Sequence, residues 1–310
     1  MSHTPRQVHI QEVSPRDGLQ NECRFVDTDA KVAMVDALSE CGFSKIEVTS
    51  FTSPRAIPAL RDAEAVMHRI KRNPNVVYTA LVPNMRGALR AMECQIDEIN
   101  VVMSVSESHN RANLRMSREE SFVQLRDVIS AVKSTTSRIN VSLSTVFGCP
   151  MEGDIEEDDV FAWVEKFHAL GVDGITLCDT TGMAYPRQVG RIATRAIALT
   201  SEIDLTFHFH NTRGIALANT LVALDAGVTR FDACLGGIGG CPYAPGATGN
   251  VCTEDLVHML EVNGIDTGVD LASVLNVSRR LPEMIGHDVP SHLLKAGHRL
   301  TKATQAATQD

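Results

Sequence analysis

Eight short runs of β-branched and apolar residues, each followed by a segment with helical periodicity, constrain the fold of this chain more than any other feature. The runs begin near Val8, Lys45, Val76, Glu98, Ile139, Gly174, Asp204 and Arg230. Successive starts are 22 to 41 residues apart, which is the spacing of repeated strand–helix–strand units with parallel strands. Three intervening helices end in the same way, at Gly42, Gly171 and Gly227, and we expect these glycines to adopt the left-handed conformation that closes a helix.

Eight parallel strands with helices between them form either a closed barrel or an open, doubly wound sheet. The open sheet usually carries a glycine-rich nucleotide loop after its first strand, whereas here that strand leads into the charged sequence Ser-Pro-Arg-Asp-Gly. We therefore predict an α/β fold, a (β/α)₈ TIM barrel over residues 1–265 with a helical extension over residues 266–310. In the extension we predict helices near Val269–Met284 and Ser291–Leu300, and a disordered tail over Thr301–Asp310.

The composition excludes several classes of protein. The formal net charge of −9, from 29 basic and 38 acidic side chains, argues against nucleic-acid binding, which needs a basic surface. No run approaches the roughly 20 apolar residues that span a bilayer, so we expect no membrane partner. The segment Met1–Gln7 is too short and polar for a signal peptide, and we expect a cytoplasmic protein.

None of the eight cysteines forms a C-x-x-C pair, which argues against disulfides and structural zinc.

The strongest local signal is the sequence Phe-His-Phe-His at residues 207–210. Alternate residues of a strand share one face, so His208 and His210 should point the same way and could bind one ion. The alternative is a pair of hydrogen-bonded core histidines. In barrels of this type the chemistry gathers at the carboxyl ends of the strands, where Asp17 follows the first strand and Asn250 lies in the loop after the eighth. A set of His, His, Asp and Asn is therefore geometrically reachable.

The chemistry of this donor set narrows the choice of metal. Two imidazoles, one carboxylate and one amide oxygen suit Mg²⁺ or Mn²⁺, with Zn²⁺ or Co²⁺ as further options. Two histidines and one carboxylate also fit a non-haem iron oxygenase, although such enzymes are usually built on a different, antiparallel fold.

Two further groups lie near the predicted cavity. Arg16 offers a planar fork of donors for a carbonyl or enolate oxygen. It could instead form a salt bridge with a carboxylate such as Glu47, and the two roles are compatible because Glu47 could hold Arg16 in position. The loop over residues 235–250 contains six glycines, with Cys241 at its centre, and is either mobile or a backbone cradle for an anion. A lone loop cysteine is usually inert, but a place above a metal cavity favours a chemical role for Cys241.

Taken together, these motifs resemble the 3-hydroxy-3-methylglutaryl-CoA lyase family across residues 8–265. The segments that carry the resemblance are Val13–Glu22, Thr49–Pro54, Gly148–Pro150, Phe207–Asn219, Gly239–Ala244 and Gly249–Asn250. The start of the first segment is shared with a wider group of metal-dependent barrels that includes isopropylmalate synthases and aldolases.

The resemblance implies a mechanism and a role for each matching residue. It implies a lyase that cleaves a 3-hydroxyacyl-CoA through a thioester enolate, with a small acyl-CoA as substrate and a homodimer as assembly. Asp17, His208, His210 and Asn250 match the ligands of a divalent cation, Mg²⁺ or Mn²⁺. Arg16 matches the residue that stabilises the enolate, Glu47 an active-site acid, and Cys241 the loop cysteine that helps to protonate the enolate. Asp179 and Glu254 match positions near the site, and His208 or a neighbour of the metal is the candidate base.

Departures from the family pattern cluster around the expected acyl pocket. Asn211 stands where an Asp is usual, Arg213 where an aromatic residue is common, and the segment Ser108–Arg111 replaces an apolar and basic one. Citramalyl-CoA and longer 3-hydroxy-3-substituted glutaryl-CoAs are therefore alternative substrates to 3-hydroxy-3-methylglutaryl-CoA. A metal-dependent aldolase or Claisen synthase on the same barrel is the alternative activity.

Overall fold

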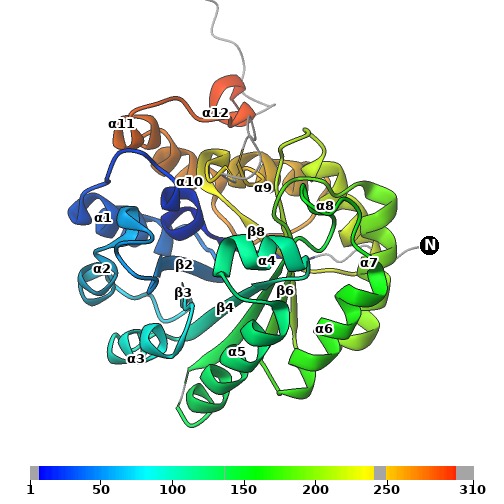
Figure 1. Cartoon of the computed structure of the whole chain (residues 1–310). Coiled ribbons are helices and arrows are strands. Elements are labelled where there is room, and N and C mark those ends of the chain that lie inside the picture. Colours follow the sequence, from blue (N-terminus) through cyan, green and yellow to red (C-terminus); the bar gives the residue numbers. More distant parts are fainter. Residues whose placement is uncertain (1–6, 136, 241–248, 298–310) are drawn as a thin grey trace, which may run out of the picture.

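A computed structural model describes residues 7–135, 137–240 and 249–297, and it confirms the predicted (β/α)₈ barrel (Figure 1). The strands are β1 (His9–Glu12), β2 (Lys45–Ser50), β3 (Val77–Leu81), β4 (Glu98–Ser104), β5 (Arg138–Ser144), β6 (Gly174–Asp179), β7 (Asp204–Phe209) and β8 (Arg230–Ala233). Each strand pairs in parallel with the next along the chain. The barrel closes where β1 pairs with β8, with Ile10 opposite Phe231 and Gln11 opposite Asp232.

Helices surround the strands (Figure 1). They are α1 (Thr28–Ser39), α2 (Ala63–Arg69), α3 (Met85–Glu93), α4 (Glu107–Leu114), α5 (Arg118–Val132), α6 (Glu157–Ala169), α7 (Pro186–Leu199), α8 (Ala216–Ala226) and α9 (Thr253–Val262). The predicted closing device is confirmed, because Gly42, Gly171 and Gly227 have φ values of 89°, 67° and 109°, in the region that glycine enters without steric cost. Within the described residues, no helix has the length and apolar character needed to cross a bilayer.

Polar side chains pair with one another inside the barrel, near the amino ends of the strands. At the amino ends of β2 and β4, Lys45 Nζ lies 2.5 Å from Glu98 Oε1. Between β1 and β7, Gln11 Nε2 donates to Thr206 Oγ1 over 2.9 Å. Burying a polar group is costly unless it forms a hydrogen bond. These pairs therefore stabilise a polar interior at the amino end of the barrel. The open space that remains lies at the carboxyl ends of the strands.

The extension after the barrel consists of α10 (Leu271–Ser278), α11 (Leu281–Ile285) and α12 (His292–Ala296), and it packs outside the barrel against α1 and α9 (Figure 1). The single helix predicted near Val269–Met284 is wrong, because the structure divides it into α10 and α11. Pro282 lies in the first turn of α11, where a proline is tolerated, whereas inside a helix it would remove a hydrogen bond. The predicted disordered tail, Thr301–Asp310, lies outside the described residues.

A buried carboxylate joins the barrel closure to the helix that follows it. Glu12, at the end of β1, accepts hydrogen bonds from Leu235 N at 3.0 Å and from Thr253 Oγ1 at 2.7 Å. It also accepts one from Ser14 N at 2.9 Å. Burial raises the pKa of Glu12 to about 7, although these hydrogen bonds oppose the shift. The carboxyl group therefore favours its neutral form in the folded chain at mildly acidic pH.

This raised pKa predicts how stability depends on pH. A carboxyl group whose folded pKa is raised contributes stability at low pH, and the contribution is lost as pH rises through the folded value. In urea unfolding, the free energy of unfolding of the wild type minus that of Glu12→Gln should fall by about 2 to 3 kcal/mol between pH 5 and pH 8. Glutamine keeps the acceptor oxygen but does not titrate. A difference that stays constant or rises over this range would show that Glu12 is ionised throughout.

Candidate metal centre and its cavity

A wide helical turn brings Arg16 and Asp17 to the same side of the chain. β1 leads into a π-helical turn, η1 (Ser14–Gly18), that has Pro15 near its start, and Asp17 N donates to Val13 O over 2.7 Å. On a continuing strand the two side chains would face opposite ways. In the turn, Arg16 Nη1 contacts Asp17 Oδ1, and both residues line the central cavity.

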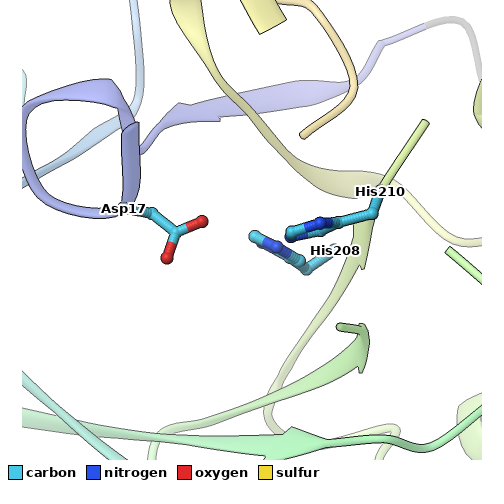
Figure 2. Close-up of side chains that lie close together, drawn as sticks. All are labelled: Asp17, His208 and His210. Carbon is cyan, nitrogen blue, oxygen red and sulfur yellow. The ribbon is translucent and has the colours of Figure 1, made fainter. Parts of the chain in front are cut away.

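The carboxylate of Asp17 faces His208 and His210, which come from the end of β7 (Figure 2). The two imidazole centroids are 5.2 Å apart. One possible ligand atom from each of the three residues lies within 4.8 Å of the others. That separation lets one ion contact all three, so this cluster could hold a metal ion.

The end of the glycine-rich loop places Asn250 beside the cluster. This segment runs along the end of β7, where Asn211 N donates to Gly249 O over 3.0 Å and Val251 N donates to Phe209 O over 2.9 Å. Asn250 Nδ2 then donates to Asp17 Oδ2 over 2.7 Å. The structure thus brings together all four residues that the sequence suggested as ligands.

Two buried atoms indicate that these residues fit a cation. Within the part of the chain that the structure describes, His210 Nδ1 and Asn250 Oδ1 are buried without a hydrogen-bond partner. A buried polar atom without a partner is costly, and a cation beside it removes that cost. The set of two imidazoles, one carboxylate and one amide oxygen suits Mg²⁺ or Mn²⁺.

The protonation states of the cluster also suit a cation. Burial raises the pKa of Asp17, but the neighbouring Arg16, His208 and His210 have the larger combined effect. They lower the pKa of Asp17 to about 2. Burial, together with the neighbouring His208, lowers the pKa of His210 to about 3. Near neutral pH the cluster therefore contains a carboxylate and a neutral imidazole, the forms in which these side chains bind metal ions.

Arg16 is held in the cavity by Glu47. The predicted salt bridge is present, since Arg16 Nε donates to Glu47 Oε2 over 2.6 Å. The other oxygen of Glu47 accepts a hydrogen bond from Asn100 Nδ2 at 2.9 Å. Because Glu47 is fixed by two partners, it orients the guanidinium toward the space above the cluster.

Asp232, which the sequence patterns did not single out, orients one of the imidazoles. His208 Nδ1 lies 3.0 Å from Asp232 Oδ2, and a nitrogen that bonds a carboxylate leaves the other ring nitrogen, Nε2, for an ion. The hydrogen bond and charge of Asp232 raise the pKa of His208 although burial lowers it. The feature of the sequence that could have identified Asp232 is that it is an acidic residue within the apolar run of β8.

Two other predicted site residues bind the backbone of loops. Asp179 Oδ1 accepts from the backbone N–H groups of Met183 and Ala184 at 2.7 and 3.0 Å, so it shapes the loop after β6. Glu254 accepts from Gly236 N at 3.0 Å, at the start of the glycine-rich loop. Cys241 lies outside the described residues.

The cluster opens into a cavity of about 390 Å³, a size that suits a small ligand. Its lining falls into three groups. They are charged or potentially metal-binding residues, which include Arg16, Asp17, His208 and His210; apolar residues, which include Ile57, Pro58 and Leu81; and polar, uncharged residues, which include His109, Ser142 and Ser144.

Comparisons with known proteins show which proteins this chain is similar to. The HMGL-like family model matches residues 7–281. The chain is 44% identical to the hydroxymethylglutaryl-CoA lyase of Bacillus subtilis, covering 94% of this chain and 97% of that protein. It is 38% identical to the mitochondrial hydroxymethylglutaryl-CoA lyase of Homo sapiens, covering 97% and 92%. The solved HMG-CoA lyase of Acinetobacter baumannii, in complex with coenzyme A and 3-methylmalate, superposes with a TM-score of 0.94 at 49% identity, covering 98% and 99%.

A glycine beside the cluster provides a test of the metal site. Gly239 has a φ of +90°, and a Cβ there would lie 2.6 Å from Asn250 Nδ2 and 2.9 Å from Asp17 O. We expect Gly239→Ala to push these ligands apart and to lower the affinity for Mn²⁺, measured by calorimetry, by about tenfold or more.

Gly153 offers a matched control, because its φ is +80° and a Cβ there would meet nothing within 4 Å. Gly153→Ala should bear a similar backbone strain and keep the wild-type affinity for Mn²⁺. Equal affinities for the two alanine variants would contradict the placement of the ion.

Proposed function

The chain belongs to the HMGL-like family, and from this premise we propose that it is a divalent-metal-dependent lyase that cleaves 3-hydroxy-3-methylglutaryl-CoA to acetyl-CoA and acetoacetate. The observation that carries the proposal is the cluster of Asp17, His208, His210 and Asn250, which shares one cavity with Arg16. The Acinetobacter relative binds coenzyme A together with 3-methylmalate, a hydroxylated dicarboxylic acid. Between them, these two ligands contain the coenzyme A moiety, the hydroxyl and the carboxylate that the proposed substrate carries in one molecule.

The cluster defines where the substrate's oxygen atoms would lie. Asp17, His208, His210 and Asn250 would hold the Mg²⁺ or Mn²⁺, and when bound this ion supplies Lewis acidity toward the hydroxyl and carboxylate oxygens. Asp232 keeps His208 in the required orientation through the contact to Nδ1. A fixed imidazole costs no reorganisation during the reaction.

Arg16 would stabilise the charge that develops when the bond between C2 and C3 breaks. The C3 hydroxyl gives its proton to a base, for which His208 or a neighbour of the metal is the candidate, and becomes the ketone of acetoacetate. The electron pair of the broken bond stays on the acetyl thioester, and the enolate oxygen then carries the negative charge. A guanidinium keeps its positive charge at every relevant pH and can donate two parallel hydrogen bonds. Glu47 fixes this fork in advance, which is the arrangement that electrostatic stabilisation of a transition state requires.

The enolate must then be protonated at C2 to give acetyl-CoA. We assign this step to an acid at Cys241, by family resemblance, because a thiol can deliver the proton that water would otherwise supply. Asp179 and Glu254 act differently, since their carboxylates bind loop backbone. Their role is to position the loops around the reacting groups.

Acetyl-CoA release from 3-hydroxy-3-methylglutaryl-CoA tests the proposal. Release should require Mg²⁺ or Mn²⁺ and stop with EDTA. Arg16→Gln should lower kcat by about 100- to 1,000-fold, the usual cost of removing a group that stabilises an oxyanion. Arg16→Lys should lose less, because it keeps the charge but not the planar fork. Arg187→Gln, an exposed position on α7, is the matched control and should retain full activity.

Two outcomes would contradict the proposal. Cleavage that persists in EDTA would remove the cation from the reaction. A kcat within threefold of wild type for Arg16→Gln would remove the guanidinium from the stabilisation of the enolate.

A homodimer is a proposal that rests on family resemblance, and a cytoplasmic location is a proposal carried over from the sequence analysis. Analytical ultracentrifugation tests the homodimer, and a mass equal to the 33.7 kDa chain at micromolar concentration would contradict it.

Cell fractionation followed by immunoblotting tests the cytoplasmic location, and recovery outside the cytosolic fraction would contradict it.

A further inference from the structure

Two apolar side chains inside the cavity have no role in the chemistry described above. Leu81 and Val102 line the cavity from the neighbouring strands β3 and β4, and we call this pair the apolar sector. In the closed strand order, β3 lies across the barrel from β7, which carries His208, and β4 lies across from β8. The apolar sector therefore faces the cluster from the opposite side of the cavity.

Strand alternation explains why these side chains point into the cavity. Val102 follows Asn100 by two residues, so the two share the inner face of β4, where Asn100 Nδ2 donates to Glu47 Oε1 over 2.9 Å. Val102 is also the one residue of β4 that is not fully buried, because it borders the cavity. Leu81 is 8% exposed and lies opposite Asn100 in the register of β3 and β4.

The depth of the apolar sector indicates which part of a substrate reaches it. This step rests on the proposed function, in which the substrate is an acyl-CoA. The coenzyme A moiety must leave through the carboxyl end of the barrel, since paired polar side chains occupy the amino end. Leu81 and Val102 belong to the strands themselves, whereas the apolar Ile57 and Pro58 come from the connection after β2. We therefore expect the apolar sector to meet the acyl group rather than coenzyme A.

Only one substituent of C3 in the proposed substrate matches an apolar surface. The hydroxyl and the carboxylate face the cluster, and the thioester oxygen meets Arg16. The fourth substituent is the branch, a methyl group in 3-hydroxy-3-methylglutaryl-CoA, which has no polar atom. Its burial against apolar side chains is favourable, whereas a hydroxyl in the same place would lose its hydrogen bonds to water.

We propose that Leu81 and Val102 determine substrate specificity by binding an alkyl branch on C3. The preferred substrate class is a 3-hydroxyglutaryl-CoA whose C3 branch is an alkyl group rather than a hydroxylated one. Cleavage follows the same course for both kinds of branch, because the branch stays on the ketone product and takes no part in the bond that breaks.

A matched pair of thioesters tests this proposal. The 3-ethyl and 3-hydroxymethyl derivatives of 3-hydroxyglutaryl-CoA have branches of nearly equal size and differ by one hydroxyl. The wild type should cleave the ethyl compound with a kcat/KM about tenfold higher. The ratio of the two kcat/KM values is then compared between the wild type and variants, so that any difference in intrinsic reactivity cancels.

Val102→Thr changes the polarity of the apolar sector with little change in its shape. Threonine places a hydroxyl where valine has a methyl group, so the ratio of ethyl to hydroxymethyl should fall about tenfold. Val123→Thr is the matched control, because Val123 is 45% exposed on α5. Its ratio should equal that of the wild type.

Leu81→Ala changes the size of the apolar sector instead. The shorter side chain leaves room for a larger branch, so the kcat/KM for the ethyl compound should rise about fivefold relative to that for 3-hydroxy-3-methylglutaryl-CoA. Leu89→Ala, at a position 53% exposed on α3, is the control for this variant. Thermal melting shows which variants keep the wild-type fold.

The outcomes separate this inference from the proposed function. Cleavage of none of the three thioesters by the wild type would contradict the proposed function itself. A wild type that prefers the hydroxymethyl compound would overturn only the inference. Equal losses for both compounds in a folded Val102→Thr, or an unchanged ratio of ethyl to methyl in a folded Leu81→Ala, would likewise overturn it, since they would indicate a structural role alone.

Discussion

The pairing of β1 with β8 is the constraint on which the rest of this structure depends. It converts a row of strands into a closed ring, so that Asp17, at the start of the chain, comes within reach of His208 and His210 near its end. The same closure leaves no exposed strand edge. Glu12 reinforces it by bonding to residues that follow β8. An open sheet with the same strands would leave Asp17 far from both histidines.

The closed ring concentrates charge in a small space, and that charge suits a divalent cation. Asp17, Glu47 and Asp232 each carry a formal negative charge beside one guanidinium, that of Arg16. A cation with two positive charges offsets this excess where burial makes unpaired charge costly. The three carboxylates have different roles. Asp17 faces the two histidines, whereas Glu47 orients Arg16 and Asp232 orients His208. The site is thus prepared before any ligand arrives.

The sequence predicts the barrel and the donor set because both depend on local periodicity. Strand spacing indicates the ring, and the alternation around His208 and His210 indicates a shared face. It does not predict the π-helical turn that turns Arg16 and Asp17 together, since that depends on contacts with Glu47 and Asn250 far along the chain. The role of Asp232 was not predicted either, because it depends on a contact with His208, which lies on a different strand. The place of Asp179 under a loop depends on nearby backbone geometry, which residue type alone does not specify.

The central claim is that one divalent cation binds where Asp17, His208, His210 and Asn250 meet. The most direct measurement is an anomalous difference map from crystals grown with Mn²⁺, recorded on both sides of the manganese absorption edge. The account predicts one strong peak within about 2.0 to 2.4 Å of an atom from each of the four residues. A peak elsewhere in the chain, in a protein that still releases acetyl-CoA under the same conditions, would contradict it.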